Sequence, residues 1–371
     1  MKYLIFGPTS STGLSEDTYT LLLALASLNN EVLIFSTTND EKKLFKCNIE
    51  NDKLNFECIS GEIFLNFLKD QYTVVSVGAI PYAYAYLQDY RSIFLKAKKK
   101  IAYIAVEAQL DNSLNKYLTS FDLILCNSFF MKNIIDKCTD NKIITEVIYP
   151  YINLKFEESY SINIGKKILQ NKCVLAMADY KSRPKRKGFD IALKVFKLLC
   201  EEFNDLIFIL KTYEMPYKEE LRIRKEINAK NFILVNENFD KNQAITLINN
   251  SSIYFSPHRA EGFGRIIAEA MGLGTLVCAS NYSGNLDYMN LSNSVLIKGK
   301  LTKIKSYEYA SVSQDAVWFE PDLDDCMSKL RMCINMSDLK SKKLIHNATN
   351  NIQSKYGMIN CIKRIQSLFL S

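Results

Sequence analysis

Short apolar runs alternate with longer amphipathic stretches from one end of the chain to the other. Runs without a polar face are typical of strands in a parallel sheet, and the amphipathic stretches have the periodicity of covering helices. This rhythm predicts an α/β fold of Rossmann-like, doubly wound sheets. The expected strands are Lys2–Phe6, Val32–Phe35, Thr73–Val77, Ile101–Ala105, Leu123–Cys126, Ile144–Ile148, Val174–Ala178, Leu206–Leu210, Phe232–Val235, Ile253–Phe255, Thr275–Cys278 and Val295–Ile297, and the expected helices include Glu16–Leu28, Phe189–Glu202 and Ile266–Met271.

The rhythm occurs twice, which predicts two domains. It is interrupted near Pro150 and along the polar segment Ser159–Lys167. We expect a first domain over residues 1–155, a second over 156–350, and a C-terminal helix over 351–371 that can cross back to the first domain. Open α/β sheets bind ligands beyond the carboxyl ends of their strands, so two facing sheets would border one interdomain cleft.

The composition and charge of the chain exclude several classes of protein and of site. The chain has 371 residues, of which 48% are hydrophobic, and this excludes a disordered or collagen-like protein. Only two histidines occur, His258 and His346, which excludes a multi-histidine metal site. The formal charge of +7 suits an anionic ligand but is too small for a protein that coats nucleic acid. Ten scattered cysteines without a CxxC pair, and the lack of a signal peptide or membrane-spanning run, favour a cytoplasmic protein.

The most informative segment is Ser256–Met271, where an apolar strand leads through a loop with two glycines into a helix. Gly262 and Gly264 let a ligand approach the backbone, and the helix N-terminus directs N–H groups at it, a combination that suits a phosphate. Glu261 and Glu269 are about two helical turns apart, so both carboxylates can face one cleft and bind sugar hydroxyls. On spacing alone, a helix-start glutamate and a surface glutamate fit equally well.

This Glu261-x7-Glu269 pattern resembles the signature of the retaining family 4 glycosyltransferases of GT-B fold. The surrounding blocks look like a bacterial subgroup with many mannosyltransferases of surface-polysaccharide assembly. The second half of the chain carries the resemblance well and the first half only loosely. The blocks that carry it are Asp179–Gly188, His258–Met271, Ala279–Met289 and Val317–Leu323, with Ala105–Glu107 and Phe121–Ser128 in the first half.

The resemblance implies a role for each matching residue. Glu261 would contact the hydroxyls of the donor sugar, and Glu269 would hold the ribose hydroxyls of the nucleotide. Arg186 and Lys187 would neutralise the diphosphate, since fixed cations can stabilise the charge on this leaving group without a metal. The remaining residues expected to bind the donor in the second domain are Gly262, Phe263, Gly264, Lys211 and His258.

Several of these assignments have an alternative. Many family members carry an arginine where this chain has Asp179, so Lys181 and Arg183 compete with Arg186 to supply the second cation. Lys211 ends an apolar run and could equally be a solvated strand-end lysine. His258, together with the arginine that follows it, either touches the donor or packs the loop.

In the first domain, the segment from Gly7 to Gly13 follows the first strand. Its glycines and hydroxyls would line the donor diphosphate or the acceptor, with an ordinary β-to-α turn as the alternative. Relatives often have a histidine near the donor sugar here, and this domain has none. Glu107 is the best substitute for contacting sugar or acceptor, with a helix-capping or ion-paired glutamate as its alternative.

These features predict a retaining, metal-independent glycosyltransferase without a cofactor. It would move a sugar, with mannose from GDP-mannose favoured, onto a hydroxyl of a glycan or lipid-linked acceptor. The alternatives are a UDP- or dTDP-linked donor, a nucleotide-sugar epimerase of the same fold, and a catalytically silent binding subunit. The scarcity of histidines counts against the epimerase, and the intact charged residues of the signature count against the silent subunit.

Two further patterns bear on metals and membranes. Asp322 and Asp324 imitate the metal-binding DxD of the other major glycosyltransferase fold, but they open a helical stretch, where acidic residues are favoured anyway. We therefore expect no metal there.

The lysine run of residues 96–100 predicts reversible contact with an anionic membrane face, with a solvated helix end as its alternative. Its apolar neighbours are Phe94, Leu95, Ile101 and Tyr103.

Overall fold

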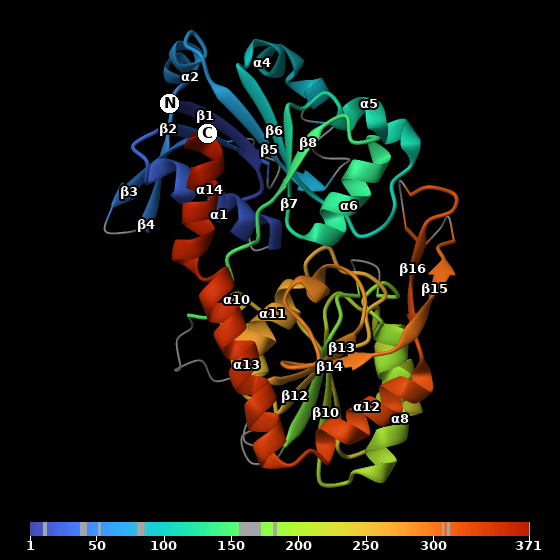
Figure 1. Ribbon diagram of the computed structural model, residues 1–371. Coiled ribbons are helices and arrows are strands. Elements are labelled where there is room, and N and C mark those ends of the chain that lie inside the picture. Colours follow the sequence, from blue (N-terminus) through green and yellow to red (C-terminus); the bar gives the residue numbers. More distant parts are fainter. Residues whose placement is uncertain are drawn as a thin grey trace. The chain divides into compact units, whose positions relative to one another are not determined.

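The computed structural model describes residues 1–9, 13–37, 43–50, 53–79, 85, 87–155, 172–180, 184–305, 308–309 and 312–370. The chain divides into two compact units (Figure 1). The first consists of Met1–Tyr151 with Lys355–Ser371, and the second of Ile152–Ser354. Each is built on a largely parallel sheet flanked by helices, which confirms the α/β fold expected from the apolar runs.

The first unit holds an eight-stranded sheet in the order β4-β3-β2-β1-β5-β6-β7-β8. Leu4 and Phe6 of β1 belong to one apolar core, and Tyr3 and Ile5 belong to the core on the other face. Strands buried on both faces need no polar side, which explains the continuous apolar runs. The elements are β1 (Lys2–Gly7), α1 (Gly13–Ala26), β2 (Glu31–Ser36), β3 (Leu44–Glu50), β4 (Lys53–Cys58), α2 (Gly61–Phe67), β5 (Thr73–Ala79), α4 (Arg91–Lys96), β6 (Lys99–Ala105), α5 (Asn115–Leu118), β7 (Leu123–Cys126), α6 (Phe129–Cys138), β8 (Ile144–Val147) and α14 (Met358–Leu370).

The apolar runs did not predict β3 and β4, which form an antiparallel hairpin at the edge of this sheet. In β3, Phe45, Cys47 and Ile49 pack on the core, whereas Asn48 and Glu50 are exposed. Alternation of this kind is typical of an antiparallel strand with one face in solvent, and a search for continuous apolar runs passes over it. The first sheet is therefore mixed rather than wholly parallel.

The C-terminal helix α14 packs along α1. Ile365 and Phe369 lie in the same core as Tyr3, whose ring meets that of Phe369 at 5.5 Å. Arg364 donates a hydrogen bond to the carbonyl of Val147 at 2.8 Å. Although α14 comes last in the chain, it completes the core on one face of the first sheet.

The second unit holds a six-stranded parallel sheet in the order β11-β10-β9-β12-β13-β14. A separate antiparallel pair, β15 and β16, follows in the chain and was not predicted as strands. The elements are β9 (Cys173–Met177), α8 (Phe189–Glu202), β10 (Ile207–Thr212), α9 (Tyr217–Glu226), β11 (Phe232–Asn236), α10 (Lys241–Asn249), β12 (Ile253–Ser256), α11 (Arg265–Gly272), β13 (Leu276–Ser280), β14 (Val295–Ile297), β15 (Gly299–Lys303), β16 (Val317–Pro321), α12 (Leu323–Ile334) and α13 (Asp338–Tyr356).

The strand order places a topological switch point between β9 and β12. From β9 the chain proceeds to β10 and β11 on one side, and then returns to β12 on the other. Because the connections on the two sides diverge, a crevice opens beyond the carboxyl ends of β9 and β12, and ligands of such sheets bind there. Residues 178–180 and 184–188, which follow β9, and residues 257–264, which follow β12, are the described segments at this point.

The lysine run of residues 96–100 joins the end of α4 to the start of β6. Of its apolar neighbours, Phe94, Ile101 and Tyr103 are buried in the cores of the first unit, and Leu95 is 69% exposed. The expectation that this whole apolar group accompanies the lysines at a membrane surface is therefore wrong, and membrane contact stays a prediction that rests on the lysines and Leu95. Among the described residues, no helix is both long and apolar enough to cross a bilayer.

We predict that Ile365→Ala destabilises the protein by about 2–5 kcal/mol, because it removes a buried side chain and leaves a cavity. Ile365 is 1% exposed, whereas Ile359 on the same helix is 69% exposed. Ile359→Ala is thus the matched control, with an expected change within about 0.5 kcal/mol. Urea unfolding of both variants measures the difference, and equal losses would contradict the packing of α14.

Candidate functional site

Two loops meet at the carboxyl edge of the second sheet. The backbone N–H of Arg259 donates to the carbonyl of Arg186 at 2.7 Å, which ties the loop after β12 to the loop after β9. Gly188 has φ +72°, and a Cβ there would lie 1.9 Å from the carbonyl oxygen of Pro257. Only glycine permits both this conformation and this approach.

A compact charge cluster lies where the loops meet. The ammonium of Lys187 is 2.5 Å from Oε1 of Glu261, and the guanidinium of Arg186 is 3.6 Å from the same oxygen. Arg186 and Glu261 are buried, and the side chain of Lys187 is 21% exposed. Burial would raise the pKa of Glu261, but the positive charges of Lys187 and Arg186 outweigh it and hold the pKa at about 2. Glu261 is therefore a carboxylate throughout the ordinary pH range.

The loop that carries Glu261 is fixed by its neighbours. The Glu261 N–H donates to Oγ of Ser283 at 2.9 Å, and the Gly284 N–H donates to the Glu261 carbonyl at 3.0 Å. A Cβ on Gly284 would lie 1.8 Å from the carbonyl oxygen of Gly262. The hydroxyl of Tyr288 donates to the carbonyl of Gly264 at 2.7 Å and also lies 3.1 Å from the carbonyl of Phe263. The loop is therefore held rigidly over the switch point.

The segment that leads into α11 has the geometry expected for a ligand-binding turn. Gly264 has φ +83° and forms the N-cap of α11, so the N-terminus of this helix begins inside the site. The ring of Phe263, by contrast, is 3% exposed and packs at 5.0 Å on the ring of Tyr288. The structure thus gives Phe263 a packing contact, and its predicted contact with a donor stays a prediction.

Glu269, on α11, is also buried. Burial raises the pKa of the Tyr254 hydroxyl, and the charges of Glu261 and Glu269 raise it further. Both carboxylates therefore act electrostatically on this one buried residue of β12. The structure brings together the two glutamates that the sequence paired by spacing.

His258 is completely buried below the loop. Nδ1 lies 3.1 Å from the carbonyl of Ser256, and Nε2 lies 3.2 Å from the carbonyl of Tyr282 and 3.0 Å from Oδ1 of Asn285. Desolvation lowers the pKa of His258. A neutral imidazole fits these contacts if Nδ1 accepts from the Ser256 hydroxyl, 3.1 Å away, and Nε2–H donates to the Tyr282 carbonyl and Oδ1 of Asn285. This is the geometry of the loop-packing alternative, in which His258 holds the loop after β12 to the segment after β13.

Lys211, at the end of β10, is 7% exposed. Its ammonium lies over the rings of Tyr213 and Phe239, at 5.2 and 4.9 Å from their centroids. Burial lowers the pKa of Lys211, and the charges of Asp179 and Glu237 oppose that shift. The alternative of a solvated strand-end lysine is therefore wrong, because the side chain is desolvated. Of the other cation candidates, Lys181 and Arg183 lie outside the described residues.

The first-domain candidates belong to the first unit. Gly7 ends β1, and a Cβ there would lie 2.8 Å from Oγ1 of Thr18 on α1. Gly13 is the first residue of α1, and residues 10–12 between the two glycines lie outside the described residues. Glu107 is partly buried beyond the carboxyl end of β6. Their contacts with donor or acceptor stay predictions.

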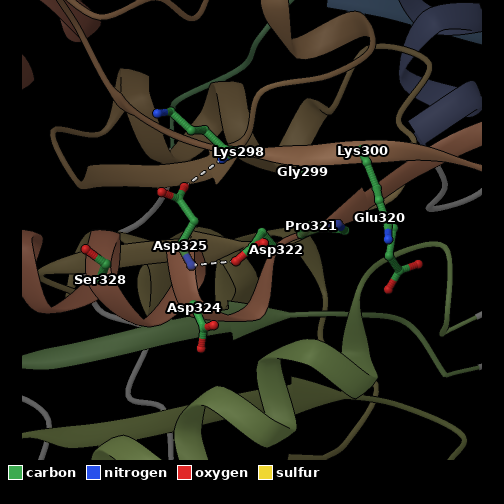
Figure 2. A pocket seen from close by; sticks show the side chains of 9 residues that line it. All are labelled: Lys298, Gly299, Lys300, Glu320, Pro321, Asp322, Asp324, Asp325 and Ser328. Carbon is green, nitrogen blue, oxygen red and sulfur yellow. Dashed lines mark hydrogen bonds between the residues drawn. The ribbon is translucent and has the colours of Figure 1, made fainter.

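The two aspartates of the DxD-like pattern lie at the start of α12 (Figure 2). Asp322 is the N-cap and accepts the N–H of Asp325 at 2.9 Å, and Asp325 accepts the N–H of Lys298 at 2.7 Å. Capping accounts for Asp322, as expected for acidic residues at a helix start. Within the described part of the chain, no group of three or more His, Cys, Asp or Glu side chains is arranged to hold a metal.

Comparison with known sequences supports a family for this site. Residues 171–308, which contain both loops, match the family described as Glycosyl transferases group 1. This match covers less than half of the chain, so it is a likeness to that family of the part that holds the two loops. The chain is also 30% identical over 133 residues to Protein CapJ of Staphylococcus aureus, a match that covers 35% of this chain and 32% of that protein. The chain thus spans about a third of the length of its curated relative.

Comparison with solved structures addresses the fold. Sucrose-phosphate synthase from Thermosynechococcus elongatus has a TM-score of 0.69 at 14% identity, over 100% of this chain and 98% of that chain. An alpha,alpha-trehalose-phosphate synthase (UDP-forming) from Burkholderia xenovorans, in complex with glucose-6-phosphate, has a TM-score of 0.68 at 9% identity, over 100% and 99%. At such identities the likeness shows the fold alone, and that fold is GT-B, as the resemblance implied.

Sequence reasoning missed the residues that support the site. Asp190 and Glu320 hold the guanidinium of Arg259, and Ser283 holds the Glu261 loop. Glu320 lies in a block that carried the family resemblance, but nothing in its spacing indicated Arg259 as its partner.

We predict that Glu261 makes the free energy of unfolding fall more steeply as the pH is lowered. Its pKa is about 2 in the folded protein against an ordinary value of 4.5, so its contribution to stability is present above pH 4.5 and is lost as the pH falls towards 2. Each unit of difference corresponds to about 1.4 kcal/mol. Urea unfolding across this window should show a shallower pH dependence for Glu261→Gln than for the wild type.

The control for that measurement is Glu201→Gln, which removes an exposed carboxylate of α8. It should keep the pH dependence of the wild type. If Glu261→Gln has that same dependence, the buried ion-pair cluster is not formed in solution.

Proposed function

We propose that this chain is a retaining glycosyltransferase that moves a sugar from a nucleotide-sugar donor to a hydroxyl of a glycan or lipid-linked acceptor. The observation that carries the proposal is the buried cluster of Lys187, Arg186 and Glu261 at the switch point, beside the N-terminus of α11. The group 1 family match over residues 171–308 supports the same donor class.

Among the cations of the described residues, Lys187 is the best placed for the donor diphosphate. Its side chain is partly exposed, whereas Arg186 is buried and donates to the Ala260 carbonyl at 3.0 Å. Lys187 would contact the diphosphate and Arg186 would add positive charge from behind it. The first N–H groups of α11 favour an anion in the same place. Such fixed charges stabilise a leaving nucleoside diphosphate as its negative charge builds.

The two buried glutamates would hold the neutral parts of the donor. Glu261 is ionised and can accept hydrogen bonds from sugar hydroxyls while it keeps its ion pair with Lys187. Glu269, on α11, would accept hydrogen bonds from the ribose hydroxyls. Both side chains are buried and held by α11 or its preceding loop, so a bound donor meets acceptor groups already oriented for it.

The resemblance to retaining enzymes favours front-face displacement. The acceptor oxygen bonds to the anomeric carbon as the bond from that carbon to the diphosphate breaks, and the hydroxyl proton passes to an oxygen of the departing phosphate. The protein orients the reactants and stabilises the charge. Glu107 in the first unit is the candidate contact for the sugar or acceptor.

The donor sugar and its base are the least constrained part of the proposal. GDP-mannose rests on the sequence resemblance, whereas one protein of similar fold is UDP-forming, which makes UDP-sugars the first alternative. Thermal shift against a panel of GDP-, UDP- and dTDP-sugars tests this, because a ligand at a hundred times its Kd adds about 2.7 kcal/mol of stability.

The same panel separates the rival functions. The selected donor is incubated with and without a bacterial membrane lipid extract as the acceptor source, and the products are analysed by mass spectrometry. Transfer that needs the extract supports the proposal, and conversion of the donor without an acceptor indicates an epimerase. Binding without any turnover would favour a silent subunit, and no binding of any donor would overturn the proposal.

We predict that Lys187→Ala and Glu269→Ala weaken donor binding without unfolding the protein. Each removes a charge-assisted hydrogen bond, which costs about 1.5–3 kcal/mol. Lys197→Ala is the control, since Lys197 is an exposed lysine paired with Glu226 on the surface. Calorimetry with the selected nucleotide sugar measures the loss of affinity. Unchanged affinity in both variants would contradict the roles of Lys187 and Glu269 in donor binding.

We also predict that transfer survives exhaustive treatment with EDTA, because Lys187 and Arg186 supply the positive charge at the site. The measurement is the rate of product formation before and after chelation. If EDTA abolishes transfer and manganese restores it, Asp322 and Asp324 become candidate metal ligands again.

A further inference from the structure

The guanidinium of Arg259 has all of its hydrogen-bonding capacity occupied by the protein. Its side chain is 2% exposed. Two N–H groups donate to the Asp190 carboxylate at 2.7 and 2.9 Å, two donate to the Glu320 carboxylate at 2.6 Å each, and one donates to the Lys185 carbonyl at 2.5 Å. A guanidinium has five N–H donors, so none is left for a ligand. The alternative in which Arg259 touches the donor is therefore disfavoured by geometry.

These partners come from three segments of the second unit. Lys185 directly precedes Arg186 in the loop after β9, Asp190 lies in the first turn of α8, and Glu320 lies in β16. The Phe319 N–H also donates to the Arg259 carbonyl at 3.0 Å. Arg259 thus joins the loop that carries the cations to the loop that carries Glu261, and anchors both to the β15–β16 pair.

The surroundings keep Arg259 charged and in place. Burial would lower its pKa, but the carboxylates of Glu320 and Asp190 outweigh burial and raise it. The ring of Trp318 lies 5.7 Å from its Cζ, and the ammonium of Lys185 lies 5.8 Å from the same ring. Glu308 pairs with Lys185 as well, so a second contact ties the cation loop to the segment between β15 and β16.

We propose that Arg259 is a positioning residue of the donor site, which touches no substrate but holds Arg186 and Lys187 against Glu261. The assignment rests on the proposed function for its effect on donor binding. Without the guanidinium, two carboxylates and one carbonyl lose their donor. The loop from residue 184 to Gly188 then keeps its backbone hydrogen bond and the contacts of Arg186 and Lys187 with the loop after β12, but loses the tie that fixes Lys185. Lys187 would then be held less firmly at the place where it meets a diphosphate, because its loop has lost one of its anchors.

The first test is calorimetry of UDP and GDP binding to Arg259→Gln. We expect affinity to fall about tenfold or more, a change of about 1.4 kcal/mol or larger. Arg331→Gln is the matched control, since Arg331 also joins two elements, α12 and α8, through Glu202. It should bind like the wild type. Arg259→Lys, which keeps the charge but offers fewer donors, should lie between the two.

A double-mutant cycle separates positioning from a direct contact. If Arg259 acts through Lys187, the effect of Arg259→Gln shrinks strongly when Lys187→Ala is already present. Full additivity of the two losses would overturn the proposal, as would wild-type affinity in Arg259→Gln. Should Arg259→Gln not fold, Glu320→Gln and Arg259→Lys replace it in the cycle with smaller losses of the same pattern.

A second readout does not depend on nucleotide binding. The Glu261 carboxyl carbon, labelled with ¹³C and assigned by its absence in Glu261→Gln, reports its own titration. In Arg259→Gln the pKa should rise from about 2 towards the ordinary value, because Lys187 and Arg186 are no longer held beside it. An unchanged titration overturns the positioning role. If the wild type binds neither UDP nor GDP, the proposed function fails, and this titration still decides the role of Arg259.

Discussion

A carboxylate that is removed from water must be paired with a positive charge. In the second unit this requirement applies to Glu261, and the surrounding loops meet it. Desolvation alone raises the pKa of this carboxyl and so favours its neutral form, whereas Lys187 and Arg186 favour the ionised form. These cations come from a loop 74 residues earlier in the chain, and they can reach Glu261 only if two loops are held in register. Much of the surrounding structure, from the switch point to β16, serves that alignment.

The alignment is achieved by close backbone contact as much as by charge. Gly188 and Gly284 each bring one segment to a distance from another that a side chain would forbid. His258 fills the space below the loop with both ring nitrogens in contact with protein groups. A site that must present charges to a diphosphate and hydroxyl acceptors to a sugar gains from this rigidity, because little has to reorganise on binding.

The parallel sheet explains why the site lies where it does. β9 and β12 are neighbours in the sheet although 75 residues of intervening chain form the strands on the far side of β9. The crevice beyond their carboxyl ends follows from that order alone. The first unit repeats the principle with β1 between β2 and β5, and it places Gly7 and Glu107 at the corresponding edge of its own sheet.

The sequence by itself determined the parallel strands, because a strand buried on both faces must be apolar throughout. It likewise determined the spacing between Glu261, in the loop before α11, and Glu269 on that helix. It also pointed to Arg186 and Lys187 through a family resemblance. The antiparallel strands were not predicted, since β3 alternates polar with apolar residues and β15 is almost wholly exposed. Only the tertiary structure decided that Arg259 pairs with Asp190 and Glu320, which lie 69 and 61 residues away. Many carboxylates along the chain could pair with a given arginine, and folding alone selects which of them are desolvated beside it.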